Sequence, residues 1–154
     1  MMTLNESKNI MYSEGRRQAL DLQERSADMD GTQLYAEDSV IPDFRAACAT
    51  QNMLKRKAGL TDGFVCKSSA GRVVRLLQNY DSNVYTEEPE SYPALWGFVW
   101  SKDPAKALPF VAISTSPYNE GDCCLDGNGK VKRSRINNNV WSPFDNPSGW
   151  EEVP

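Results

Sequence analysis

Apolar positions at helical spacing are concentrated in the first third of the chain. Residues 13–28 are rich in good helix formers, although their apolar stripe is thin, and this helix is expected to end near Asp30-Gly31. A second helix is predicted to begin at Pro42, because proline is tolerated in the first helical turn, and to run to about Lys57. The apolar face of this second helix consists of Phe44, Ala47, Cys48 and Leu54.

Neither predicted helix carries enough apolar surface to be stable alone, because short isolated helices are marginal without tertiary packing. Both helices must therefore dock on another structure. We expect residues 1–58 to form a helical region that anchors the chain in an assembly with other chains.

Beyond residue 58 the pattern changes to short apolar segments separated by turns, and all four Trp and all but one of the nine Pro lie there. This half contains an internal repeat. An offset of 58 residues places Gly63-x-x-Cys66 on Gly121-x-x-Cys124, and it places Gly71-x-Val73-x-Arg75 on Gly129-x-Val131-x-Arg133, without a gap. Matched positions in the same order indicate two related structural units.

The match continues to the end of each copy. With two short insertions in the first copy, Asn83-Val84-Tyr85 aligns with Asn139-Val140-Trp141. Both copies then close on a proline followed three positions later by a tryptophan, at Trp96 and at Trp150. We interpret this half as two tandem modules, residues 59–100 and 110–154, with a linker at residues 101–109.

Each module is predicted to be a small antiparallel sheet of about three strands. In the second copy, Asp126-Gly127 and Asn128-Gly129 are strong hairpin signals. Such a sheet buries little apolar area, so one large aromatic should provide most of the packing, and Trp96 and Trp150 are the expected structural aromatics. The predicted fold class is α+β, with an N-terminal helical arm followed by two tandem β modules.

Composition and charge restrict the function classes. The 154 residues are 40% hydrophobic and 25% charged, and the net charge of −4 argues against nucleic acid as the main partner. No apolar run approaches the ~20 residues needed to cross a bilayer. The first residues also lack the basic and apolar regions of a secretion signal. We expect synthesis in the cytoplasm, no nucleic-acid binding and no membrane insertion.

The chain contains no histidine, which excludes Ser-His-Asp and Cys-His mechanisms and removes the usual zinc ligand. The four cysteines form no Cys-x-x-Cys pair, so we expect no metal site and no cofactor. Glu87, Glu88 and Glu90 lie in a proline-containing loop and are expected to be solvated. A glycosidase needs two carboxyl groups that flank a cleft, so we expect the protein not to be an enzyme.

The C-terminal copy carries a recognisable set of motifs. Tyr118-x-x-Gly121-Asp122 is followed by a glycine-rich hairpin ending at Gly129-Lys130, by Asn139-Val140-Trp141-Ser142-Pro143, and by Pro147-x-x-Trp150-x-x-Val153. These motifs resemble the small chitin-binding type of carbohydrate-binding module, families five and twelve. They look most like the modules appended to tail proteins of bacteriophages and prophages. The resemblance covers residues 110–154, extends to residues 59–100 only through the repeat, and does not reach residues 1–58.

The resemblance implies a short twisted sheet that presents surface aromatics to a polysaccharide. Trp141 is then the sugar platform and Trp150 a structural aromatic, while Tyr85 holds the matching place in the first copy. Tyr118 and Asn139 complete the glycan-binding candidates. A pyranose stacks its C–H face on an indole, and asparagine amides offer donors and acceptors to sugar hydroxyls.

The chain departs from the family at Lys132-Arg133-Ser134-Arg135, where the family has an aromatic pair, and at Thr61-Asp62-Gly63 in the first copy. As an alternative, Trp141 and Tyr85 cover the edge of a small core or face a neighbouring subunit, because aromatics are also enriched at protein interfaces.

The resemblance implies a non-catalytic component of a bacteriophage virion, in the tail or baseplate, that acts as an accessory adhesin for a host cell-envelope glycan. Residues 1–58 would join other virion proteins, and the protein is expected to be a homo-oligomer. Two alternatives remain: a purely structural virion protein whose modules mediate subunit contacts, and an accessory module for a separate hydrolase.

Overall fold

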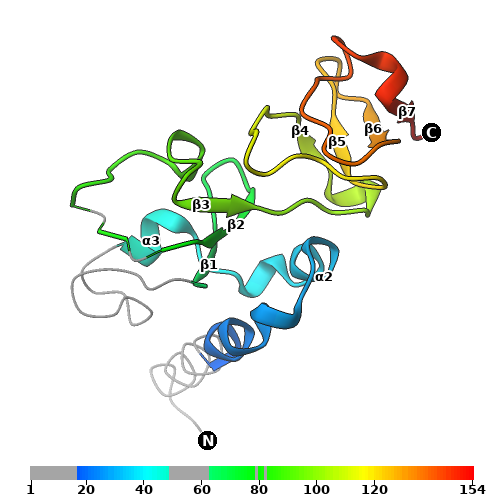
Figure 1. Ribbon diagram of the computed structural model, residues 1–154. Helices are drawn as coiled ribbons and strands as arrows, with labels where there is room; N and C mark the ends of the chain where they lie inside the picture. Colours follow the sequence, from blue (N-terminus) through cyan, green and yellow to red (C-terminus); the bar gives the residue numbers. More distant parts are fainter. Residues whose placement is uncertain (1–16, 49–62, 79, 82) are drawn as a thin grey trace, which may run out of the picture.

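The computed structural model describes residues 17–48, 63–78, 80–81 and 83–154 (Figure 1). Residues 17–25 are helical. The remaining helical elements are η1 (Ser26–Asp28), α2 (Gly31–Ala36), η2 (Asp38–Val40), α3 (Phe44–Cys48), η3 (Pro89–Ser91), η4 (Pro104–Lys106) and η5 (Pro147–Gly149). The strands are β1 (Val65–Lys67), β2 (Val73–Leu76), β3 (Trp96–Phe98), β4 (Leu108–Pro109), β5 (Cys123–Leu125), β6 (Val131–Ser134) and β7 (Trp150–Glu152).

The helical region is more broken than the sequence predicts. The first helix ends just before Asp30-Gly31 as expected, because η1 stops at Asp28 and Met29 is extended. A further helix that was not predicted from the sequence, α2, then begins at once, since Asp30 and Gln33 form a reciprocal capping box. In the second predicted helix, Phe44 and Ala47 are buried as expected, and Cys48 is partly buried. Leu54 and the remainder of that helix lie outside the described residues.

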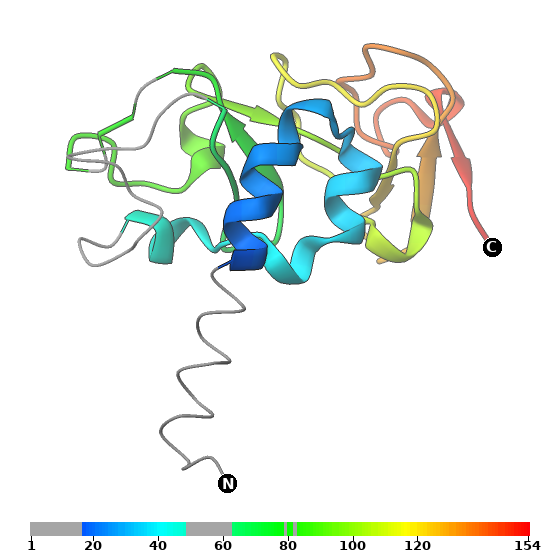
Figure 2. The same cartoon turned by 90° about the horizontal axis from the view of Figure 1, so that it is seen from below.

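The described part of the helical region packs on the first sheet of the same chain. The Gln23 side chain pairs with both backbone groups of Val65, which satisfies the outer edge of β1. The Tyr35 hydroxyl accepts from Val73 N at 3.0 Å and donates to Val99 O at 3.0 Å. Figure 2 shows these helices on one side of the first sheet, where α2 contacts β2 and α3 contacts β1. The core formed there contains Leu22, Leu34, Tyr35, Ile41, Val65 and Val73.

The second half forms two separate sheets, which confirms the α+β prediction of a helical region followed by two small β modules. The first sheet has the order β1-β2-β3 and the second has the order β4-β5-β6-β7. All pairings are antiparallel except that β4 runs parallel to β5. The second sheet therefore has one strand more than expected, and β4 lies in the segment expected as a linker.

The two sheets have the same strand register. Val65 pairs with Arg75 in the first hairpin, and Cys123 pairs with Arg133, each 58 residues further on, in the second. The closing strands also correspond, because Leu76 pairs with Trp96 as Ser134 pairs with Trp150. The repeat in the sequence is therefore a repeat in three dimensions.

The two modules share one hydrophobic core. Phe98 stacks on Trp100 with ring centroids 6.0 Å apart, and Trp100 stacks on Tyr118 at 4.2 Å. Tyr118 then meets the edge of Trp150 at 5.4 Å. Arg72 also joins the modules, because its guanidinium donates to Pro109 O at 2.8 Å. No helix in the described segments has the length and apolar character needed to span a membrane.

Candidate functional site

Two exposed aromatic side chains lie three residues apart on the C-terminal module. Trp141 is 51% exposed and Phe144 is 92% exposed, which is far above the exposure of the aromatics in the shared core. Both belong to the loop of residues 140–146 that leads from the Tyr118–Asn139 bridge into η5. We call this segment the aromatic loop.

The aromatic loop is held at its base by Asn139, which is fully buried. The Asn139 amide nitrogen donates to Ser134 Oγ at 3.0 Å and to Gly149 O at 3.2 Å, and its amide oxygen accepts from Trp141 N at 3.3 Å. A buried amide with these partners satisfies its polar atoms, and it fixes the point at which the loop leaves the sheet.

A second contact fixes Trp141 itself. The Trp150 indole nitrogen donates to Trp141 O at 2.9 Å, so the buried tryptophan of the module holds the backbone of the exposed one. Further along, Ser142 closes the turn, because its hydroxyl accepts from Asp145 N at 3.0 Å and its carbonyl accepts from Asn146 N at 2.9 Å. The loop is thus ordered by the protein's own contacts.

Two of the glycan-binding candidates must be corrected. Tyr118 is 1% exposed and Asn139 is 0% exposed, so neither side chain reaches a ligand on the surface. Tyr118 is a core aromatic between Trp100 and Trp150, and burial raises the pKa of its hydroxyl well above the ordinary value. Both residues support the aromatic loop from beneath.

In the first module, Tyr85 occupies the position equivalent to Trp141, and its packing is different. Tyr85 is partly buried, with its ring 5.6 Å from Tyr80 and 5.3 Å from Tyr92. The Tyr80 hydroxyl donates to Tyr85 O. Tyr85 is therefore packed into an aromatic cluster, and it lacks the exposure of Trp141.

Trp96 and Trp150 both lie in the core, at 0% and 4% exposure. Trp96 packs against Phe44 at 5.7 Å and Tyr80 at 5.2 Å, while Trp150 packs against Phe110 and Tyr118. Their positions fit the structural role that the sequence assigns to them.

The basic residues of β6 are matched by acidic partners. Arg133 pairs with Glu151 at 3.5 Å across the sheet, and Lys132 lies 3.9 Å from Asp126. Because consecutive side chains of a strand point to opposite faces, each face of β6 carries one of these paired cations. Two of the three cations in the segment that replaces the family's aromatic pair, Lys132 and Arg133, are therefore ion-paired.

All four cysteines are free thiols, and Cys66, Cys123 and Cys124 are buried. Within residues 17–48, 63–78, 80–81 and 83–154, no group of three or more His, Cys, Asp or Glu side chains is placed to hold a metal ion. Burial raises the pKa of the Cys66 thiol, and it raises that of Cys124 to about 12. Both thiols are therefore protonated at neutral pH and weakly reactive.

No protein-family model and no curated protein matches this chain.

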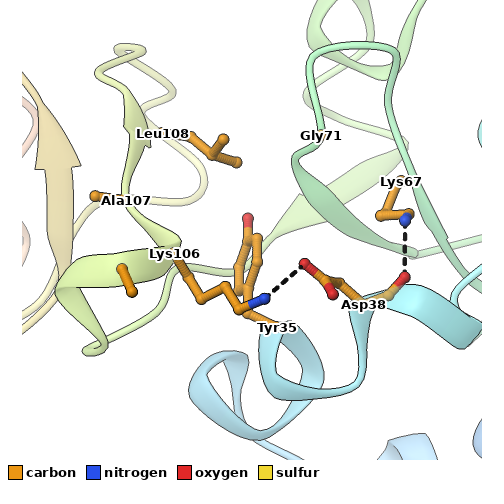
Figure 3. Close-up of a pocket in the computed structure, with 8 residues that line it drawn as sticks. Tyr35, Asp38, Lys67, Gly71, Lys106, Ala107 and Leu108 are labelled. Atoms are coloured by element: carbon orange, nitrogen blue, oxygen red, sulfur yellow. Dashed lines mark hydrogen bonds and ion pairs between the residues drawn. The ribbon is translucent and has the colours of Figure 1, made fainter. Parts of the chain in front are cut away.

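A cleft of about 320 Å³ lies where α2 and η2 face the first hairpin and β4 (Figure 3). Lys67 Nζ donates to Asp38 O at 2.7 Å, and Lys106 Nζ pairs with the Asp38 carboxylate at 3.2 Å. The Tyr35 hydroxyl on its wall is also fully paired. Each charged or hydroxyl side chain that lines this cleft therefore has at least one partner within the protein.

Phe144 is the residue that sequence reasoning missed. It lies between Pro143 and Asp145, in a turn where a large aromatic has no core to enter. An apolar ring in such a proline- and aspartate-containing turn was the available signal.

Proposed function

We propose that the protein is a non-catalytic glycan-binding component of a bacteriophage particle, and that Trp141 and Phe144 contact a glycan of the host cell envelope. The exposure of both rings on one ordered loop carries the proposal. The resemblance of residues 110–154 to chitin-binding modules of phage tail proteins supports the choice of ligand and of particle.

The physical case rests on preorganisation. A loop that is already ordered loses little conformational entropy when a ligand binds. The Trp141 ring offers an apolar face for the C–H groups of a pyranose, and Phe144 adds a second apolar ring within three residues. Several copies on one particle would convert weak single sites into firm attachment.

Retention of the full chain on chitin and on purified bacterial cell envelopes tests this proposal. Trp141→Ala is expected to weaken retention about tenfold, because it removes an apolar contact worth about 1.4 kcal/mol. Phe144→Ala is expected to weaken it by a smaller factor, because the phenylalanine ring is smaller than the indole. Leu77→Ala is the matched control, since Leu77 is an exposed apolar residue (53%) of the first module.

The melting temperature of each variant shows whether the fold is intact. The glycan role would be rejected if wild-type protein is not retained on any of these polysaccharides. It would also be rejected if Trp141→Ala, correctly folded, is retained as well as the wild type.

A structural role is the second candidate, favoured by the 92% exposure of Phe144 and the 51% exposure of Trp141. Exposed aromatics of this kind are typical of protein interfaces. Light scattering coupled to gel filtration distinguishes the two roles. A self-association that Phe144→Ala abolishes, together with no retention on glycans, would favour subunit contacts.

The anchoring role of residues 1–58 is part of the same proposal. The inward face of residues 17–48 is covered by the first sheet of this chain, so another virion protein would contact their outer face, where Leu20 is 42% exposed.

A further inference from the structure

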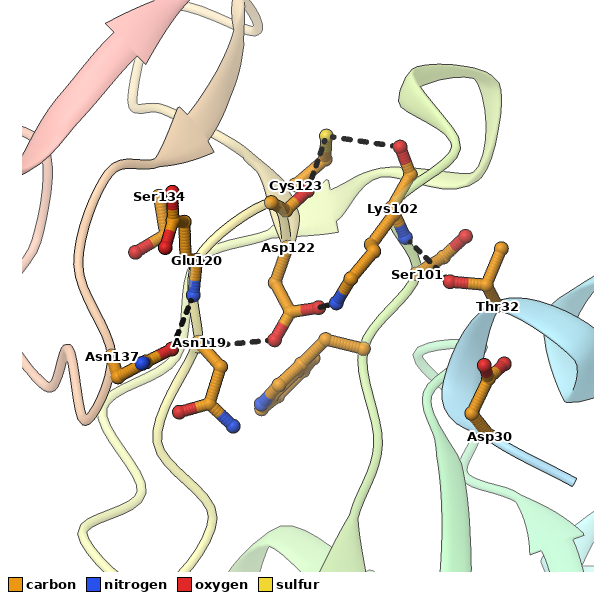
Figure 4. A network of polar contacts seen from close by, with 12 residues as sticks. Asp30, Thr32, Ser101, Lys102, Asn119, Glu120, Asp122, Cys123, Ser134 and Asn137 are labelled. Carbon is orange, nitrogen blue, oxygen red and sulfur yellow. Dashed lines mark hydrogen bonds and ion pairs between the residues drawn. The ribbon is translucent and has the colours of Figure 1, made fainter. Parts of the chain in front are cut away.

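A second cleft, of about 230 Å³, lies where three segments distant in sequence meet. Asp30 and Thr32 come from the start of α2, and Lys102 follows β3. Asn119 and Asp122 come from the second module. Figure 4 shows the α2 residues on one side of Lys102, and Asn119 and Asp122 on the other. Phe98, Trp100 and Pro117 supply the apolar part of the wall, in which Phe98 and Trp100 are only 6% and 7% exposed.

The walls of this cleft are fixed by hydrogen bonds between the segments. Thr32 Oγ1 accepts from Lys102 N at 2.9 Å, and Lys102 Nζ pairs with Asp122 at 3.2 Å. The other Asp122 oxygen accepts from Asn119 N at 2.8 Å. Gly31 allows the close approach of α2, because a Cβ at this position would lie 2.1 Å from Trp100 O. The cleft is therefore preformed.

Several polar atoms on these walls have no protein partner among the described residues and are open to solvent, since Asp30 and Asn119 are exposed and Thr32 is partly exposed. Asn119 Oδ1 accepts from Asn138 N, whereas both hydrogens of the Asn119 amide nitrogen are unused. One Asp30 carboxylate oxygen caps α2 and the other is unused. The Thr32 hydroxyl accepts from the backbone and retains its own hydrogen for donation.

The charge and hydrogen-bond types select the class of ligand. An anion would meet two carboxylates and one ammonium group, and that ammonium group is already paired with Asp122. A divalent cation would find only the Asp30 carboxylate outside an ion pair. The unused groups are both donors and acceptors beside an apolar wall. Hydroxyl groups on a carbon ring match this mixture, since each hydroxyl both donates and accepts.

We propose that the cleft between α2 and the second module binds one neutral sugar residue, with its hydroxyls on Asn119, Thr32 and Asp30 and its C–H face toward the apolar wall. This site is separate from the aromatic loop. The ligand is either a free monosaccharide or the terminal residue of a glycan chain, and the two present the same ring.

The test is a titration of the ¹⁵N-labelled full chain, followed by amide chemical shifts. The probes are glucose, galactose and N-acetylglucosamine as free sugars, and chitotriose as a chain end. We expect saturable shifts at Thr32, Lys102 and Asn119 with at least one of them. Response to chitotriose alone would identify a chain end as the ligand, and response to a free sugar would identify the monosaccharide.

The decisive variant is Asn119→Asp. It keeps the oxygen that accepts from Asn138 N, removes both amide donors, and is expected to weaken binding about fivefold. Asn128→Asp, the same change on an exposed turn of the second hairpin, is the matched control and should leave binding unchanged. Asp30→Asn provides a second variant that preserves the helix cap, because asparagine also caps well.

Trp141→Ala separates this proposal from the proposed function. Saturable shifts at the cleft that persist in Trp141→Ala and weaken in Asn119→Asp support the cleft, whatever happens to retention on polysaccharides. The proposal is overturned if no sugar produces saturable shifts there. It is also overturned if sodium sulfate or calcium chloride alone produces them, or if Trp141→Ala rather than Asn119→Asp abolishes them.

Discussion

The closing tryptophans of the two modules differ in whether the indole nitrogen has a hydrogen-bond partner. The Trp150 indole nitrogen donates to Trp141 O, whereas the Trp96 indole nitrogen is buried and has no partner among the described residues. The Tyr85 carbonyl, which corresponds to that of Trp141, accepts instead from the Tyr80 hydroxyl. An unpaired buried donor lowers stability, so Trp96 contributes packing alone.

This difference predicts unequal effects of the same substitution. Trp150→Phe and Trp96→Phe remove the same atoms, but only Trp150→Phe also removes a hydrogen bond and leaves the Trp141 carbonyl unpaired. We expect Trp150→Phe to lower the free energy of unfolding by about 1–3 kcal/mol more than Trp96→Phe. Urea unfolding of the two variants measures the difference, and equal losses would contradict this interpretation.

At the scale of elements, each hairpin turn depends on one glycine. Gly71 and Gly129 have φ values of 86° and 77°, in the left-handed region that disfavours residues with a Cβ. Each closes its turn in the same way, since Gly71 N donates to Ser68 O and Gly129 N donates to Asp126 O. Both copies of the repeat therefore have the same glycine-dependent turn.

Gly129→Ala is expected to destabilise the protein by about 1–2 kcal/mol, entirely through the backbone, because a Cβ there would meet nothing within 4 Å. Gly127 in the same turn also has open space around it but no positive φ, so Gly127→Ala serves as the control. Thermal unfolding of both variants measures the effect. A loss in Gly127→Ala as large as in Gly129→Ala would show that φ is not the cause.

The β modules were predictable from local sequence signals. The elements that were missed depend on contacts between residues distant in sequence, or on a local signal that was interpreted differently. The glycine turns and the closing tryptophans recur in both copies, so the strands and their equivalence follow from the sequence. α2 was missed because Gly31 was interpreted as a helix stop, although Asp30 and Gln33 have the spacing of a capping box. β4 is only two residues long and is defined by its parallel partner β5, which no local pattern reveals.

The candidate site was predicted in part. The sequence singled out Trp141, but the burial of Asn139 and Tyr118 depends on contacts with Ser134, Gly149 and Trp100 that form only in the folded chain. The cleft between α2 and the second module was not predictable, because its walls come from segments up to about ninety residues apart, beyond the reach of local sequence patterns.

At the scale of the whole molecule, Trp100 links the two modules. It follows β3 of the first sheet, it is 7% exposed, and it stacks on Tyr118 of the second module while its indole nitrogen donates to Ser116 O. A core that is continuous across both sheets should make them unfold together rather than one at a time.

Trp100→Ala is expected to lower the free energy of unfolding by about 3–5 kcal/mol. In the wild type, amide signals of Gly71 and Gly129 should disappear at the same urea concentration, since both modules share the core that Trp100 completes. Trp141→Ala, which removes an exposed tryptophan, is the control and should leave the urea concentration at the unfolding midpoint nearly unchanged. Separate midpoints for the two glycines in the wild type would contradict a single cooperative unit.

The second sheet ends at β7, and its last strand bears Glu151 and Glu152 on opposite faces. An open strand edge is a template for ordered aggregation when its side chains are apolar. Another molecule aligning along β7 would bring like-charged carboxylates together on either face at neutral pH. The two carboxylates therefore disfavour edge-to-edge pairing of two molecules along β7.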